Sequence, residues 1–191
     1  IRPHFIYNTL GSIEQLCSID PPKAGELVHN FAKYLRGNFR ELDNPKPILM
    51  SQEMEHVRHY ISIENVRFPD MTFSFEMNSD DFHIPALTIQ PIVENAIKHG
   101  LMHKEGLKLL NIKVEMFEGI WCFTIDDNGI GRKASEIINL KVKKHISFAT
   151  KAIDNRVKLI NKTNKISIDI EVIDKRNDFG QPTGTKIKIY I

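Results

Sequence analysis

The chain has 191 residues, of which 41% are apolar and 26% charged, as in a globular protein with a buried core in one or two domains. Its net charge of +2 is small for this length and argues against nucleic acid or an anionic membrane as the main partner. No stretch approaches the roughly 20 apolar residues that cross a bilayer. Cys17 and Cys122 match no metal-ligand spacing, and two thiols in such a chain indicate a reducing compartment.

The first 42 residues predict two amphipathic helices that form a hairpin. Asp20 is the expected N-cap of the second helix, with Pro22 in its first turn. A hairpin of this size cannot bury its apolar stripes alone, so we expect it to dimerise or to dock on the next domain. One stripe consists of Phe5, Leu10, Ile13 and Leu16, and another, at three- and four-residue steps, of Leu27, Phe31, Tyr34 and Leu35.

The proline-rich "LDNPKPILM" is the expected linker, which predicts domains at residues 1–44 and 45–191. After it, Ser51 is the expected cap of a helix that runs to about Phe68. The strict alternation of "MTFSFEM" predicts a half-buried strand. "PALTIQPIVENAIKHG" is expected to be a helix with Pro91 inside it and Gly100 as its stop.

The remainder predicts strands. "NIKVEMF" and "IWCFTID" flank the turn Glu118-Gly119 as a hairpin, a helix follows at about 148–160, and "ISIDIEVI" and "TKIKIYI" close the chain as strands. The expected class is α+β: an N-terminal helical hairpin followed by an α/β sandwich, whose mixed, mostly antiparallel sheet carries its helices on one face.

Three short motifs concentrate the polar chemistry. In "VENAIKHG", Asn95 shares a helix face with Lys98 and His99, and an amide oxygen beside cationic groups suits a divalent cation and phosphate. In "DDNGIG", glycines after Asp127 let the backbone approach a ligand, and a carboxylate there can accept a hydrogen bond from an exocyclic amino group. In "PTGTKIKI", Gly184 introduces the last strand. Each motif taken alone is equally typical of a solvated helix face or an ordinary turn.

The order of the three motifs resembles the Bergerat-type ATP-binding fold, and "IRPHFIYNTL" resembles the phosphoacceptor motif of the LytS/YesM type of sensor histidine kinase. "YISIENVRF" and "IPALTIQPIVENAIKHG" follow in that family's order, and the similarity covers nearly the whole chain. No GxxxxGK[ST] or GxGxxG loop competes with this interpretation.

The resemblance implies a protein histidine kinase of a two-component system. His4 would be the phosphoacceptor, with Asn8 one helical turn away as its orienter, and Asn95 would hold Mg²⁺. The phosphoryl group would pass to an aspartate of a response regulator. The implied nucleotide-site residues are Asn95, Lys98, His99, Asp127, Gly129, Gly131, Gly184 and Thr185.

One departure from the family pattern keeps an alternative open. Ala149 stands where the family has a glycine, in an expected lid from about 132 to 150, so a scaffold protein with the same fold and weak phosphotransfer is the alternative function. A Bergerat-type ATPase ranks lower, because Pro91 occupies the place of the glutamate that activates water. We expect the chain to be the cytoplasmic portion of a longer bacterial inner-membrane sensor, homodimeric through its N-terminal helices.

Overall fold

A computed structural model describes residues 3–43, 46–79, 81–141 and 168–191. By their contacts the residues form two units, one of Ile1–Pro69 with Asp81–Gln90, and one of Asp70–Asp80 with Pro91–Ile191. The domains predicted at 1–44 and 45–191 were separated by their expected functions, and they stay a prediction. The contact units have other boundaries, because the third helix packs on the second and therefore falls in the first unit.

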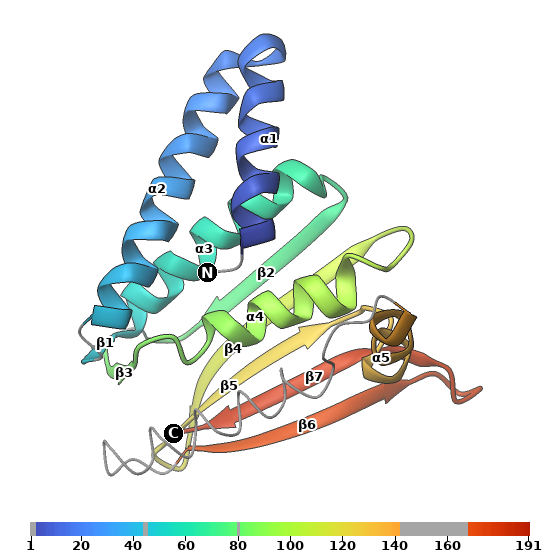
Figure 1. The fold of residues 1–191 in the computed structure, drawn as a ribbon. Helices are drawn as coiled ribbons and strands as arrows, with labels where there is room; N and C mark the ends of the chain where they lie inside the picture. The colour runs from blue at the N-terminus through green and yellow to red at the C-terminus, as the bar shows by residue number, and fades with distance from the viewer. Residues whose placement is uncertain (1–2, 44–45, 80, 142–167) are drawn as a thin grey trace. The chain divides into compact units, whose positions relative to one another are not determined.

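The first unit contains three helices and a short two-stranded sheet (Figure 1). The helices α1 and α2 form the predicted hairpin, and Asp20 caps α2 by accepting a hydrogen bond from the Lys23 backbone N–H at 3.1 Å. In the two-stranded sheet, β1 and β3 pair antiparallel. The elements are α1 (Pro3–Ile19), α2 (Pro21–Asp43), β1 (Pro47–Leu49), α3 (Met50–Arg67) and β3 (His83–Pro85).

Two details of this unit differ from the sequence expectation. Leu10 is 49% exposed, whereas Thr9 is the buried residue at that level of α1, so the apolar stripe is not continuous. Ser51 is not an N-cap, because α3 begins at Met50 and the Gln52 side chain accepts the hydrogen bond from the Leu49 backbone N–H at 3.2 Å.

The second unit is a five-stranded sheet in the order β2-β4-β5-β7-β6, with α4, η1 and α5 over one face (Figure 1). Strands β2 and β4 pair in parallel and the other neighbours antiparallel, which confirms the mixed, mostly antiparallel sheet. The elements are β2 (Met71–Met77), α4 (Gln90–Asn95), the π-helix η1 (Ala96–Leu101), β4 (Lys108–Phe117), β5 (Ile120–Asp127), α5 (Arg132–Lys141), β6 (Asp169–Arg176) and β7 (Pro182–Tyr190).

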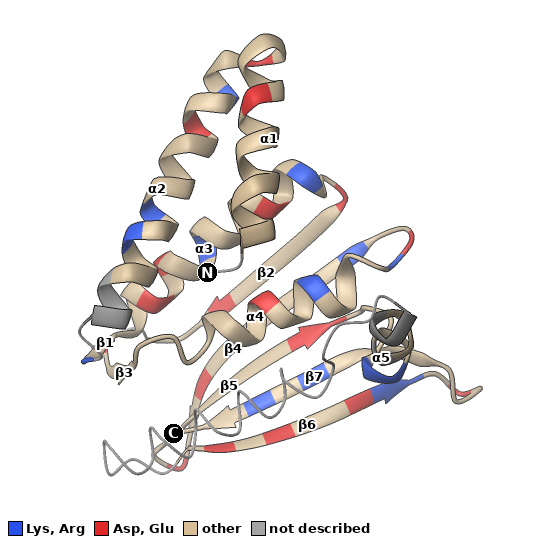
Figure 2. Cartoon of the chain, in the orientation of Figure 1, with Lys and Arg blue, Asp and Glu red and all other residues tan. Residues whose placement is uncertain are grey.

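The strands predicted from alternation are confirmed in β2, β4 and β5. Glu118 and Gly119 both have positive φ, 51° and 82°, as the tight turn of a two-residue hairpin requires. The buried face of the sheet is built from alternate residues such as Ile112, Phe123 and Ile125. Acidic positions of β6 neighbour basic positions of β7 (Figure 2), and Lys188 of β7 forms an ion pair with Glu171 of β6 at 3.7 Å.

The helix predicted for "PALTIQPIVENAIKHG" is shorter and of another kind. It begins at Gln90, so Pro91 lies in the first turn, where its missing N–H has no intrahelical partner to lose. From Ala96 it continues as a π-helix through Gly100 to Leu101. The helix predicted at 148–160 and Ala149 lie outside the described residues.

No helix in the described part of the chain is long and apolar enough to cross a membrane. Cys17 and Cys122 are free thiols.

Candidate functional site

The centre of the site in the second unit is the carboxyl group of Asp127 at the end of β5. Asp127 is only 4% exposed. Its Oδ1 accepts hydrogen bonds from the backbone N–H groups of Gly129, at 2.8 Å, and Thr185, at 3.3 Å. Within the described residues Oδ2 accepts none, so it can accept a hydrogen bond from a ligand.

Three glycines pack against Asp127 or against one another more closely than any side chain would allow. A Cβ on Gly184 would lie 2.0 Å from the Asp127 carbonyl oxygen, and its φ of 130° is also unfavourable for other residues. A Cβ on Gly129 would lie 2.4 Å from the Gly100 carbonyl carbon, and one on Gly100 would lie 2.9 Å from Asp127 Oδ1. The structure therefore brings Gly100, Asp127, Gly129 and Gly184 together around one carboxyl group.

Gly131 and Asn128 complete the loop after β5. Gly131 has a φ of 76° and packs beside Pro182. The Asn128 side chain accepts a hydrogen bond from the Leu109 N–H at 2.8 Å and donates one to the Leu107 carbonyl at 3.1 Å, as a neighbouring strand would. Neither Asn128 nor Gly100 was predicted to belong to the site. In the sequence, Asn-Gly is typical of any turn, and a glycine at the end of a helix is typical of a helix stop. The roles of Asn128 and Gly100 become visible only from the residues that they contact elsewhere in the chain.

Burial raises the pKa of the Asp127 carboxyl to about 6, although hydrogen bonds from Gly129 and Thr185 and the nearby charge of Lys175 oppose the rise. The carboxyl group is therefore held in an environment that favours its neutral form unless a ligand offers a donor. A buried acceptor of this kind can select an amino group, because an unsatisfied acceptor at this depth is costly.

Asn95, Lys98 and His99 lie on the helical run that packs on β4, β5 and β7, and all three are half-buried. Asn95 is the last residue of α4, and Lys98 and His99 belong to η1. The expectation that they share a face rests on α-helical spacing. In η1 the hydrogen bonds run over five residues, as from the Met102 N–H to the Ile97 carbonyl at 2.8 Å, so that spacing rule does not apply.

The π-helix η1 is hydrogen-bonded to the loop that follows Asp127. Gly100 is its fifth residue, and its carbonyl accepts a hydrogen bond from the Ile130 N–H at 3.2 Å. Backbone of the loop after β5 is thus bonded directly to backbone of η1. Widened helical turns of this kind occur frequently at functional sites.

His4 lies in the first unit, in the first turn of α1, and its side chain is exposed. The Asn8 amide nitrogen lies 3.1 Å from His4 Nδ1 and 3.3 Å from Nε2. The neighbouring Phe5 packs into an aromatic cluster, with its ring centroid 5.0 Å from Tyr34 and 5.4 Å from Tyr60. Phe5 therefore fixes the turn from which the imidazole projects into solvent.

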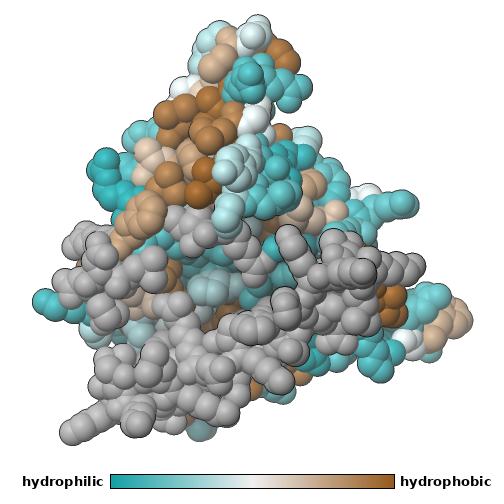
Figure 3. Space-filling model, viewed as in Figure 1, coloured by the Kyte–Doolittle hydropathy of each residue, from teal (hydrophilic) through white to brown (hydrophobic). Residues whose placement is uncertain are grey.

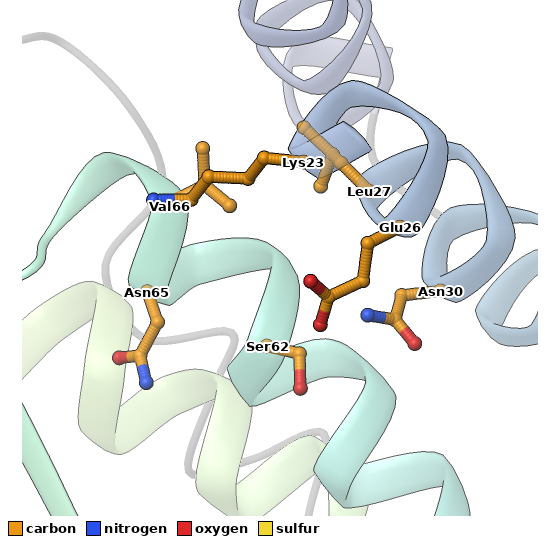
Figure 4. Close-up of a pocket in the computed structure, with 7 residues that line it drawn as sticks. All are labelled: Lys23, Glu26, Leu27, Asn30, Ser62, Asn65 and Val66. Carbon is orange, nitrogen blue, oxygen red and sulfur yellow. The ribbon is translucent and has the colours of Figure 1, made fainter. Parts of the chain in front are cut away.

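One further pocket, of about 230 Å³, opens between α2 and α3 (Figure 4). None of the predicted site residues lines it. Its lining is polar and apolar in mixture: Lys23, Glu26, Leu27, Asn30, Ser62, Asn65 and Val66.

In the described ranges there is no group of three His, Cys, Asp or Glu side chains that could hold a metal ion. A bound phosphate can supply a metal ion with oxygen ligands beside those of the protein. Mg²⁺ is commonly held in this way, by one or two side chains with phosphate oxygens and water, and an amide oxygen such as that of Asn95 suits it.

Comparison with known proteins points to one family. The histidine kinase family model matches residues 1–72. The chain is 36% identical over 145 residues to protein YwpD of Bacillus subtilis (strain 168), a match that covers 73% of this chain and 51% of that protein. It is 31% identical over 170 residues to the sensor histidine kinase YpdA of Escherichia coli (strain K12), covering 88% of this chain and 29% of YpdA. It is 32% identical over 134 residues to the sensor protein LytS of Staphylococcus haemolyticus, covering 69% of this chain and 23% of LytS.

The chain thus spans between about a quarter and a half of the length of these relatives. A solved structure, the mycobacterial sensor histidine kinase MprB, has the same fold, with a TM-score of 0.52 at 14% identity over 77% of this chain and 96% of that one. The relatives, the family match and the shared fold agree with the motif order in the sequence, and the chain belongs to the histidine kinases, among the sensor kinases of the LytS type.

Proposed function

We propose that this chain is the kinase region of a two-component sensor, which uses ATP with Mg²⁺ to phosphorylate His4 and passes the phosphoryl group to an aspartate of a response regulator. The observation that carries the proposal is the buried Asp127 carboxyl inside its glycine cradle. Its Oδ1 is occupied by two backbone donors and Oδ2 is left to accept from the adenine amino group.

The residues present fit Mg²⁺ held partly by the substrate. Asn95 would supply one oxygen ligand and the ATP phosphates others, and the bound ion would offset phosphate charge. Lys98 and His99 follow Asn95 by three and four residues, in the π-helix, and would also offset phosphate charge.

In the proposed transfer, the lone pair of one His4 ring nitrogen forms a bond to the γ-phosphorus. The bond from that phosphorus to the bridging oxygen breaks, its electron pair leaves with ADP, and the ring N–H proton is released to solvent. Most of the acceleration would come from positioning and charge stabilisation.

Asn8 can set which nitrogen reacts. If its amide donates to Nδ1, the ring proton is on Nε2. In the flipped amide, which has the same heavy-atom shape, the oxygen accepts from Nδ1–H and leaves the lone pair on Nε2. We propose the second arrangement for transfer.

The hairpin supports the proposed homodimer. Figure 3 shows apolar side chains gathered on the surface of the α1–α2 hairpin. A surface of this composition is normally covered by a partner. The exposed large side chains of the hairpin are Tyr7, Leu10, Ile19, Val28 and Phe39. The relatives are named as sensor proteins and are longer than this chain, and we propose a parent sensor that is anchored in the membrane through other segments.

Incubation with γ-labelled ATP and Mg²⁺ tests the proposal. We expect a label that is lost in acid and survives base, as a phosphorus–nitrogen bond to histidine does. Nucleotide binding without any label would instead indicate the scaffold function. A label stable in acid would place the phosphate on a side chain other than histidine and contradict the proposed reaction.

Asp127→Asn is expected to weaken ATP binding by about 10- to 100-fold. An amide can present a donor where the adenine amino group needs an acceptor, and the loss of a hydrogen bond to a charged group costs about 1.5–3 kcal/mol. Calorimetric titration of both proteins with ATP measures the difference. Equal affinities would remove Asp127 from the site.

The same pair of proteins has a predicted pH dependence. The pKa of Asp127 is raised from 3.8 to about 6, so the neutral form is favoured in the folded state. Its contribution to the free energy of unfolding is complete below the ordinary pKa and is lost as the pH rises through about 6. ATP binding, which favours the ionised acceptor, should weaken in the wild type relative to Asp127→Asn as the pH falls through the same range. Taking the ratio of the two proteins cancels the titration of ATP itself.

A further inference from the structure

Glu53 is a fully buried carboxylate on α3 with an exposure of 0%. Its Oε2 accepts a hydrogen bond from the Leu87 backbone N–H at 2.9 Å. Its Oε1 accepts two, from the N–H of Ile89 at 2.8 Å and of Gln90 at 3.0 Å. Both oxygens are therefore engaged by backbone donors of one short segment, which directly precedes and begins α4.

The segment that Glu53 binds has an unfavourable backbone conformation. Leu87 has a φ of 58°, in the left-handed region that a residue with a branched side chain seldom adopts. Such a conformation is strained and persists only where surrounding contacts hold it. Around this left-handed residue the backbone N–H groups of Leu87, Ile89 and Gln90 point toward one side chain, as backbone N–H groups do where they bind an anion. Here the anion is the Glu53 side chain.

These contacts decide where α4 starts. The Gln90 N–H is one of the donors at the start of the helix that have no intrahelical acceptor, and Glu53 satisfies it from another element. The Gln90 side chain donates to Asn38 of α2 at 3.1 Å, so the first helical residue is held from two sides. Asn95 lies five residues further along the same helix.

We infer that Glu53 is a positioning residue for Asn95: by holding the left-handed turn at Leu87 and capping Gln90, it fixes the residue at which α4 begins and hence the place of Asn95 within that helix. This role rests on the proposed function, since it assigns Asn95 to Mg²⁺. Glu53 touches neither nucleotide nor metal. Glu53 acts by placing the Asn95 amide oxygen before the nucleotide or the metal ion binds.

Glu53→Gln is the sharpest test, because it preserves volume but leaves one acceptor oxygen and puts an NH₂ group against a backbone donor. We expect the affinity for ATP in the presence of Mg²⁺ to fall about 10- to 100-fold, as for the loss of a group that orients a metal ligand. The affinity for ADP without Mg²⁺, set by Asp127, should be unchanged. In amide hydrogen exchange, protection of Leu87, Ile89 and Gln90 should be lost selectively.

Two carboxylates of α3 serve as controls. Glu64 is also buried, at 2% exposure, and pairs with Arg67 at 3.0 Å, so Glu64→Gln reports the general cost of altering a buried carboxylate on this helix. Glu55 is exposed, and Glu55→Gln should resemble the wild type. Neither control should change the ratio of the Mg²⁺-ATP affinity to the metal-free ADP affinity.

The outcomes separate this role from the proposed function. A Glu53→Gln protein that melts at a lower temperature but keeps the wild-type affinity ratio would overturn the positioning role alone, as would an equal change in Glu64→Gln. Wild-type protein whose nucleotide binding ignores Mg²⁺ would contradict the proposed function, and the positioning role with it. A selective fall in the ratio for Glu53→Gln, together with loss of protection at Leu87, Ile89 and Gln90, would support the role.

Discussion

Replacing His4 with Gln is expected to abolish autophosphorylation and to leave ATP binding unchanged. Gln retains hydrogen-bonding capacity but has no imidazole nitrogen to form the bond to phosphorus. Because the His4 side chain is exposed and Phe5 holds the first turn of α1 through the aromatic cluster, the substitution should not disturb packing. Labelling with γ-labelled ATP measures the first effect, and calorimetric titration with ATP measures the second.

His29→Gln is the matched control, since His29 is an exposed histidine on the partner helix of the same hairpin. It should label as the wild type does. If the His4→Gln protein still takes up acid-labile phosphate, the acceptor is another histidine, with His29, His56 and His59 as the candidates, and the assignment of the "PHFIYNTL" motif is wrong.

The correctly predicted parts of the fold are those in which the spacing of apolar residues matches the repeat of a strand or a helix. Alternation in "MTFSFEM" gives a strand whose residues Met71, Phe73, Phe75 and Met77 share a face, and the strand is observed at those bounds. The hairpin α1–α2 follows from three- and four-residue steps together with the cap at Asp20. In these cases each residue acts mainly through neighbours in its own element.

Features that depend on distant partners were not predictable in this way. Glu53 is expected on the surface by its chemistry, and only the N–H groups of Leu87, Ile89 and Gln90, more than 30 residues away, explain its burial. The pairing of β1 with β3 joins two three-residue segments, of which the first lies within the proline-rich stretch expected to be a linker. Apolar periodicity says nothing of such contacts.

The candidate site shows the same division. Asp127, Gly129 and Gly184 were predicted from motif order, and the structure brings them together. Ala149, in the expected lid, lies outside the described residues. The π-helix was missed for a physical reason: the change from four- to five-residue hydrogen bonds is stabilised by the contact of Gly100 with the loop after β5, not by a local preference.

Asn95→Ala is expected to abolish Mg²⁺-dependent phosphorylation while leaving the fold intact. Asn95 is half-buried at the end of α4, and its side chain makes no hydrogen bond to another residue in the described part of the chain, so little packing or bonding is lost with it. Alanine also favours the helix. What is removed is the amide oxygen assigned to the ion. Labelling across a series of Mg²⁺ concentrations, together with the melting temperature, separates the two effects.

A second substitution distinguishes a metal ligand from a hydrogen-bond donor at this position. Asn95→Asp keeps an oxygen that can ligate Mg²⁺ but removes the N–H donors, so it should retain more Mg²⁺-dependent labelling than Asn95→Ala if the oxygen is what matters. Asn111→Ala, on the exposed face of β4, is the matched control for loss of an asparagine side chain and should label normally. Full activity in Asn95→Ala, unfolding of that variant, or equal loss in the Ala and Asp variants would each contradict the role of Asn95 as the protein's oxygen ligand to Mg²⁺.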